Sequence, residues 1–285
     1  MRRTFLLFVL AAALLAGCTQ LLFQPYRQHV RTPADIGLAY EDVRLKTADG
    51  VSLHAWFLPA KAAARGTILF LHGNAENIST HIGSVYWLPE RGFDVLLLDY
   101  RGYGASAGTP SMAGAQADIE AAMRYLLDRP GIGRSRIVIF GQSLGGALAS
   151  YYVAHSPHRA HIRALVVESA PASYRDIARE KAAGFWLTWP LQWPIAWSVS
   201  DDYSPVYTMA RISPIPLLVI HGDRDAIVPL HDGQRLYEAA QEPKELWIVP
   251  GGGHIGAFLR PEYRERFVAY LGRVSGSAAR EPLRP

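Results

Sequence analysis

The sequence predicts an α/β fold with an eight-stranded, mostly parallel sheet and helices on both of its faces. The first observation is a set of six short, nearly continuous apolar runs separated by helical stretches: residues 67–71, 95–98, 137–140, 164–167, 217–220 and 246–249. Strands that are apolar on both faces and alternate with helices form parallel sheets covered on both sides. The second observation is the alternation of apolar and polar residues over 43–46 and 51–58, around Asp49-Gly50, which indicates an antiparallel hairpin.

The composition fits one large globular domain. The chain has 285 residues, of which 49% are hydrophobic and 19% are charged, as in ordinary globular proteins. We expect the domain to span residues 41–274 and a polar tail to follow over 275–285. Cys18 is the only cysteine, which excludes an intramolecular disulfide and a cysteine-based zinc site.

The N-terminus is typical of an export signal. An apolar stretch over 5–16 follows a pair of arginines and is too short to span a bilayer comfortably. The run from Leu15 to Cys18 resembles the lipobox of bacterial lipoproteins. This resemblance implies a signal peptide over 1–17 and acyl chains on Cys18 that hold the protein on a membrane of the bacterial cell envelope.

Two alternatives to a lipoprotein signal are an ordinary signal peptide with an incidental cysteine and an uncleaved anchor. Arg2 and Arg3 also give the segment some twin-arginine character, and either export route leads out of the cytoplasm. Residues 18–40 contain Pro25 and Pro33 and lack clear periodicity. We therefore expect them to form a tether between the lipid and the domain.

The charge balance argues against a nucleic-acid partner. The chain carries 29 Lys and Arg against 25 Asp and Glu, a net charge of +4. Without Arg2 and Arg3, which leave with the expected signal, 27 basic minus 25 acidic residues give +2. Residues near the C-terminus account for this remainder: Arg273, Arg280 and Arg284 against Glu281. The domain therefore lacks the basic stripe that is typical of nucleic-acid binders.

Ser143 is the candidate nucleophile. It lies in a G-x-S-x-G motif, between the expected strand 137–140 and a helical stretch over 147–154. In this context the motif is a nucleophile elbow, whose glycines permit a tight turn that exposes the serine Oγ. The following helix points its positive N-terminus at this oxygen, and the Leu144 N–H can donate to a developing oxyanion.

His254 is the candidate general base, because a serine hydroxyl is a poor nucleophile without one. It lies in the glycine-rich loop 251–256, just past the last expected strand, from which an imidazole can reach over the sheet edge. Loop geometry accounts for His72 and His221, which each precede a glycine. Surface solvation is expected to account for five others: His29, His81, His155, His158 and His161.

The segment His221–Pro229 resembles the H-G-x-x-D-x-x-V-P segment of α/β hydrolases, whose acid matches Asp225. The order Ser143, Asp225, His254 is the order expected for that superfamily. Asp223, as a loop residue, and Glu168, which ends the preceding strand, are the alternatives for the acid.

The resemblance extends over about residues 43–272. It points to the branch that includes serine aminopeptidase-like hydrolases, monoglyceride lipase-like enzymes and acyl-protein thioesterases, and it implies the α/β-hydrolase fold. In this pattern Asp99 is expected to cap a loop. The resemblance also implies a second oxyanion donor in the loop after the third strand, where the Asn74 N–H is the first choice and the Ala75 N–H the second. The motifs that carry the resemblance are Leu71–Asn77, Asp99–Gly104, Gly141–Gly146 and His221–Pro229.

A long insert over about 174–212 is expected to form the lid of this fold. Four tryptophans recur in it at helical spacing, although Pro190 and Pro194 forbid a long regular helix. They either pack the lid onto the body, line an acyl pocket above Ser143, or rest against a lipid surface. Four acids near the insert could bind a substrate amine in an aminopeptidase: Asp176, Glu180, Asp201 and Asp202. The four tryptophans of the insert are Trp186, Trp189, Trp193 and Trp197.

These features predict a lipid-anchored hydrolase of carboxylic esters or thioesters that acts on a small-molecule or lipid-like acyl substrate through an acyl-enzyme. The mechanism requires no cofactor, and the glycine-rich stretches lack a Walker lysine. A peptidase of the same fold is one alternative. A non-catalytic binding scaffold anchored by lipid is the other, since a fold alone never proves activity.

Overall fold

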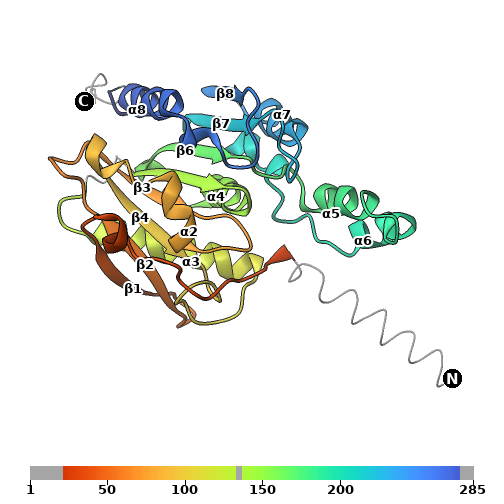
Figure 1. Ribbon diagram of the computed structural model, residues 1–285, viewed down its shortest axis with the longest axis horizontal. Helices are drawn as coiled ribbons and strands as arrows, with labels where there is room; N and C mark the ends of the chain where they lie inside the picture. The colour runs from red at the N-terminus through yellow and green to blue at the C-terminus, as the bar shows by residue number, and fades with distance from the viewer. Residues whose placement is uncertain (1–21, 133–136, 277–285) are drawn as a thin grey trace.

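The computed structural model describes residues 22–132 and 137–276, and in this part of the chain it confirms the predicted fold class. Eight strands form one sheet in the order β1-β2-β4-β3-β5-β6-β7-β8 (Figure 1). β2 runs antiparallel to both β1 and β4, whereas the other neighbouring strands are parallel. The expected signal peptide and Cys18 lie outside the described residues.

All eight strands that the sequence predicts are present, most of them one or two residues longer than the apolar runs. The hairpin forms with Val43 opposite Ala55. The strands are β1 (Glu41–Lys46), β2 (Ser52–Leu58), β3 (Gly66–Leu71), β4 (Phe93–Asp99), β5 (Ile137–Gln142), β6 (Ile162–Glu168), β7 (Leu217–Gly222) and β8 (Lys244–Val249).

Helices cover both faces of the sheet because its strands are apolar on both sides. Leu69 and Leu71 of β3 pack in one core with three helices: α3 (Met112–Asp128), α4 (Leu144–His155) and α7 (Leu230–Ala239). Ile68 and Phe70 of the same strand pack in a second core with α2 (Ile78–His81), η3 (Ile82–Ser84) and α8 (Pro261–Gly276). Short 3-10 turns complete the connections: η2 (Pro33–Ile36), η4 (Pro89–Arg91), η5 (Arg159–His161) and η9 (Ala257–Leu259).

The insert between β6 and β7 consists of short elements, as Pro190 and Pro194 require. α5 and α6 lie together and project away from the sheet (Figure 1). None of the helices within residues 22–132 and 137–276 is long and apolar enough to cross a bilayer. The elements of the insert are α5 (Tyr174–Ala183), η6 (Trp189–Leu191), α6 (Gln192–Trp197), η7 (Pro205–Tyr207) and η8 (Met209–Arg211).

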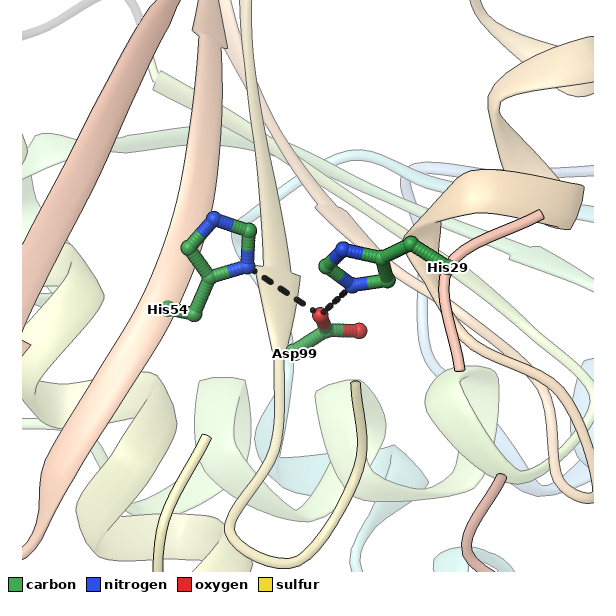
Figure 2. A group of neighbouring side chains, drawn as sticks. All are labelled: His29, His54 and Asp99. Carbon is green, nitrogen blue, oxygen red and sulfur yellow. Dashed lines mark hydrogen bonds and ion pairs between the residues drawn. The ribbon is translucent and has the colours of Figure 1, made fainter. Parts of the chain in front are cut away.

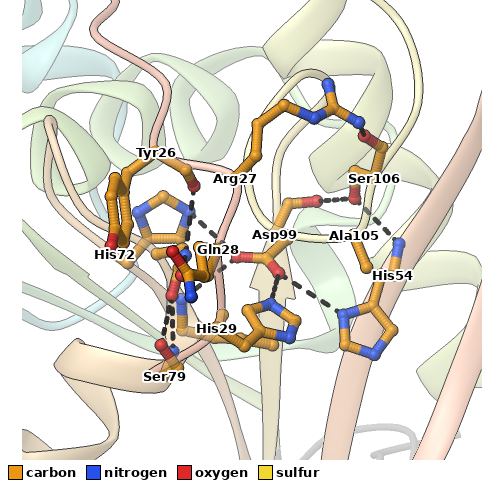
Figure 3. Close-up of polar contacts among 12 residues, drawn as sticks. Tyr26, Arg27, Gln28, His29, His54, His72, Ser79, Asp99, Ala105 and Ser106 are labelled. Atoms are coloured by element: carbon orange, nitrogen blue, oxygen red, sulfur yellow. Dashed lines mark hydrogen bonds and ion pairs between the residues drawn. The ribbon is translucent and has the colours of Figure 1, made fainter. Parts of the chain in front are cut away.

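Residues 22–30, part of the expected tether, are instead packed on the domain, and we call them the N-terminal strap. Asn77 Nδ2 donates to the backbone oxygens of Tyr26 and Gln28, at 3.0 and 2.9 Å. Arg27 donates to the Ser106 oxygen at 3.1 Å (Figure 3). Phe23 is buried. Periodicity does not reveal this docking, because an extended strap satisfies its backbone with side chains some 50 positions later in the chain.

Asp99, at the end of β4, binds the strap to the sheet. Its Oδ2 lies 2.8 Å from His29 Nε2 and 3.4 Å from Nδ1 of His54 on β2 (Figure 2). Its Oδ1 accepts from the Ile78 N–H at 3.1 Å, so it also caps α2, in line with the expected capping role. Burial would raise the pKa of Asp99, but the hydrogen bonds from His29 and His54 hold it well below its ordinary value.

Candidate active site

Ser143 lies at the sharp turn between β5 and α4. Its φ of 52° and ψ of −120° are strained for a residue with a side chain. The turn is held by the Ser143 N–H, which donates to the Glu168 backbone oxygen at 2.8 Å. The hydroxyl makes no capping bond to α4, and Ser143 is partly exposed at a cavity. This is the geometry of a nucleophile elbow.

The glycines on either side of Ser143 are required by close backbone approaches. A Cβ on Gly141 would lie 2.3 Å from the Gly145 oxygen. A Cβ on Gly145 would lie 2.2 Å from the oxygen of Leu71, at the end of β3. Neither space accepts a methyl group, so α4 can begin this close to β3 only with glycine at both positions.

His254 and Asp225 are brought together from the loops after β8 and β7. His254 Nδ1 lies 2.8 Å from Asp225 Oδ2. Asp225 Oδ1 accepts from the N–H groups of Ile227 and Val228, both at 2.9 Å. Burial would raise the pKa of Asp225, but the hydrogen bonds from His254 and Val228 lower it, so the carboxylate is ionised and can orient the imidazole.

The two alternative acids have other partners. Glu168 is buried, and its carboxylate accepts from Gln142 Nε2 at 2.7 Å and from the Ala257 N–H at 3.0 Å. Burial raises its pKa above the ordinary value. Asp223 accepts from the Gly251 N–H at 2.6 Å, as expected of a loop residue. Of the three acids, Asp225 is the one that contacts His254.

The loop after β3 lies beside Ser143, where the second oxyanion donor is expected. A Cβ on Gly73 would lie 3.3 Å from the Ser143 Cβ. Asn74 and Ala75 follow and line the same cavity, and Ala75 has a φ of 62° that turns the loop. The Asn74 side chain fixes this loop to the strap, because its Nδ2 donates to the Leu22 oxygen at 2.6 Å.

A cavity of about 770 Å³ connects these groups, within the range of small-molecule sites. Ser143 and His254 lie in it together. Its walls combine the strap, the loop after β3, α5 of the insert and the segment that follows Asp225. Its lining also includes Leu22, Gln24, Asn74, Glu76, His81, Ile177, Ala178 and Lys181.

Two histidines that were expected to be solvated on the surface instead make contacts within the fold. His81 is 4% exposed and lines the cavity, with its Nδ1 3.0 Å from Gln142 Oε1 and its Nε2 3.2 Å from Glu76 Oε2. Burial lowers the pKa of His81, so the imidazole is neutral at neutral pH. His29, which belongs to the strap, binds Asp99 at the end of β4. Sequence periodicity missed His81 because α2 is only four residues long and shows no face.

The structure excludes two of the three expected roles of the tryptophans in the insert, which are packing on the body and lining the cavity. The four tryptophans do not pack the lid onto the body, since Trp186 is 79% exposed and Trp197 is 68% exposed. The residues that line the cavity from the insert are instead Ile177, Ala178 and Lys181 of α5. The four acids also lie outside the set of lining residues. Asp176 accepts from Arg235, Glu180 lies 3.1 Å from His231, and Asp201 accepts from the hydroxyls of Ser204 and Ser173.

Two clusters in the described part of the chain have the donor types of a metal site. They are His29, His54 and Asp99, and Glu180, His231 and Asp232, each with ligand atoms within 4.8 Å of one another. In the first cluster the nitrogens lie at hydrogen-bonding distance from the carboxylate, which accounts for the cluster as the attachment of the strap. The cavity that holds Ser143 contains neither set.

Comparisons with known proteins agree with this fold. The family described as serine aminopeptidase, S33, matches residues 62–208, which include Ser143 but end before Asp225 and His254. The uncharacterized protein YfhR of Escherichia coli K12 is 39% identical over 238 residues, which cover 81% of this chain and 80% of YfhR. The α/β hydrolase domain-containing protein WAV2 of Arabidopsis thaliana is 36% identical over 80% of this chain and 76% of its own.

A solved esterase has the same fold. The Pyrococcus furiosus esterase Pf2001 superposes with a TM-score of 0.72 and 26% identity, over 89% of this chain and 98% of that structure. The conclusion rests on the eight-stranded sheet of this chain, on the elbow at Ser143 and on the family match over more than half of the sequence. The chain belongs to the serine aminopeptidase S33 family of α/β hydrolases.

Proposed function

We propose that this hydrolase cleaves carboxylic esters or thioesters through an acyl-enzyme on Ser143. The observation that carries the proposal is the pairing of His254 with the ionised Asp225 at 2.8 Å, in the cavity that also holds Ser143. A buried carboxylate at this position holds the imidazole in the tautomer whose Nε2 can accept a proton.

In the proposed reaction His254 Nε2 takes the proton of the Ser143 hydroxyl as Oγ attacks the acyl carbon. The tetrahedral oxyanion accepts hydrogen bonds from the N–H groups of Leu144 and Asn74. Its collapse expels the alcohol or thiol, which takes the proton from His254. Water, activated by the same imidazole, then attacks the acyl-enzyme, and the acid and the free serine are released.

The choice of an ester over an amide is supported by the occupation of the acids in the insert. An aminopeptidase needs a carboxylate for the substrate amine, but Asp176 is bound to Arg235 and Asp201 to Ser173. Glu76 does line the cavity and lies 3.2 Å from His81 Nε2. Its engagement with His81 makes it a weaker amine site than a free carboxylate.

We further propose that the mature protein begins at Cys18 and is lipid-anchored in a bacterial cell envelope. Labelling with a palmitate analogue tests this: incorporation is expected in the wild type and should be lost in Cys18→Ser. Equal labelling of the two proteins contradicts the anchor.

The catalytic proposal is tested by a fluorophosphonate probe together with a substrate panel. Wild-type protein should be labelled and Ser143→Ala should not. The panel compares one acyl group as ester, thioester and amino-acid amide, and it should show faster turnover of the ester and thioester. Preference for the amide favours a peptidase, and a protein that the probe does not label is a binding scaffold.

A further inference from the structure

The insert carries a concentrated apolar surface. From Ala182 to Ser200 the chain has no charged residue. Seven large apolar side chains within this stretch are at least half exposed, and we call them the apolar tip: Phe185, Trp186, Leu187, Trp189, Leu191, Trp193 and Trp197. Scattered exposed apolar residues are ordinary, but a contiguous run of this size marks an interaction surface.

The composition of the tip points to a lipid bilayer as the partner. Four of its seven side chains are tryptophans, which combine a large apolar ring with one N–H donor and concentrate at the boundary between lipid headgroups and acyl chains. Pro190 and Pro194 keep the backbone in short turns, so this segment lies in an interface and does not cross it. Protein–protein interfaces are also rich in aromatic residues, so the charges that border the tip distinguish between the two kinds of partner.

The charges that border the tip favour anionic headgroups. Arg179 of α5 lies over the ring of Trp193, 5.1 Å from its centroid. Lys181, the last charged residue before the uncharged stretch, is exposed, and its Nζ donates to the Ala226 oxygen at 3.3 Å. The acids of the same helix face α7, where Asp176 binds Arg235 and Glu180 lies 3.1 Å from His231. Arg179 is thus directed toward the tip and Lys181 is exposed at its chain boundary, and each can add about 1 kcal/mol of attraction to an anionic leaflet.

The start of the strap lies at the same cavity as the insert. Leu22 lines the cavity beside Ile177 and Ala178 of α5, so the strap and the insert border one opening. Cys18 is four residues before Leu22, and four residues span at most about 14 Å. An anchor on Cys18 would therefore hold the cavity close to the bilayer on the side of α5.

We infer that the apolar tip is a membrane-docking surface, which inserts at the lipid interface and turns the mouth of the Ser143 cavity toward the bilayer. The docking is a property of the insert and does not depend on the reaction at Ser143. A lipid on Cys18 alone would tether the protein and leave its orientation free. The tip adds a second contact, and two contacts are the arrangement that gives stable membrane binding.

Quenching of tryptophan fluorescence by brominated acyl chains tests the inference on the full-length protein, reconstituted in phosphatidylcholine–phosphatidylglycerol vesicles. Four of the seven tryptophans belong to the tip, while Trp56, Trp87 and Trp247 are buried in the domain. Emission should therefore be roughly twofold lower in brominated than in ordinary vesicles. Ser143→Ala should give the same quenching, which separates docking from catalysis.

Charge variants supply the matched controls. Trp193→Glu with Trp197→Glu keeps two reporters in the tip and should lose most of the quenching, because carboxylates oppose insertion. Arg179→Glu with Lys181→Glu should reduce quenching in anionic vesicles. Arg124→Glu with Arg273→Glu makes the same change in net charge on exposed residues of α3 and α8, and it should leave quenching unchanged.

Two results would overturn the inference. One is a vesicle-bound wild type whose emission is the same with brominated and ordinary lipids, since the tip would then remain in water. The other is sedimentation as a dimer that the Trp193→Glu, Trp197→Glu protein cannot form, together with unquenched emission, since a second copy of the chain would then cover the tip.

Discussion

The imidazole of His29 lies 2.8 Å from the buried carboxylate of Asp99, and this contact joins the N-terminal strap to the framework of the active site. The same carboxylate accepts from the Ile78 N–H at the start of α2, directly after the loop that borders Ser143. Asn74 in that loop is in turn bound to Leu22 of the strap. The strap is therefore an integral part of one wall of the cavity.

Removal of the His29 imidazole should loosen the strap. In His29→Ala the Asp99 carboxylate loses its shortest partner, and amides of residues 24–30 should exchange with deuterium roughly 10-fold faster or more, as expected for a loss of about 1.5 kcal/mol. Hydrogen exchange read by mass spectrometry measures this. Arg31→Ala, at an exposed neighbouring position, is the control. Unchanged exchange in His29→Ala would show that the other strap contacts suffice.

His54 should make stability depend on pH. Burial would lower its pKa, but the bonds to Asp99 and Asp42 raise the pKa above the ordinary value of 6.5. The charged imidazole thus stabilises the fold fully below pH 6.5, and this contribution is lost as pH rises through the raised pKa. The free energy of unfolding of the wild type, relative to His54→Asn, should fall between pH 6 and 9 in urea titrations. The exposed His155→Asn serves as control, and parallel curves for wild type and His54→Asn would refute the assignment.

Asp225 should contribute more to turnover than its neighbour Asp223. Asp225→Asn retains the shape of the side chain but favours the wrong tautomer of His254, and we expect kcat to fall roughly 10³- to 10⁴-fold on a soluble ester. Asp223→Asn disturbs only the contact with Gly251. It should reduce kcat by less than about 10-fold. Comparable losses in both variants would mean that the acid is misassigned.

Gly145 should not tolerate a methyl group. The Cβ of Gly145→Ala would lie 2.2 Å from the Leu71 oxygen, backbone against backbone. We expect a loss of about 3 kcal/mol or more in the free energy of unfolding, or failure to fold. Gly83→Ala has nothing within 4 Å of the new Cβ and should change stability by less than about 1 kcal/mol. Urea unfolding compares the two, and equal stabilities would show that the elbow can relax.

The strands and the elbow could be predicted from the sequence because their signals are local. Apolar runs of four or five residues between helical stretches reflect burial on both faces of a parallel sheet, and all of these strands are present. The glycines beside Ser143 are likewise a local requirement of one turn. The pairing of Asp225 with His254 followed from the resemblance to other α/β hydrolases, and the structure brings the two side chains together.

The residues that were misjudged take part in long-range contacts. His81 and His29 looked like solvated side chains, yet one lines the cavity and the other binds Asp99 across 70 positions of sequence. For the tryptophans of the insert, the sequence did not distinguish burial from exposure. An aromatic stripe at helical spacing is compatible with burial and with exposure, and only the placement of α5 and α6 away from the sheet decides it.

The sequence by itself determined the fold class, the turn at Ser143 and the absence of any disulfide, because these depend on residue type and on spacing within short segments. Tertiary structure alone decided that the strap forms a wall of the cavity and that the tryptophans face outward. The physical reason is that hydrogen bonds and burial join residues by distance in space, and distant segments meet only when the sheet has assembled.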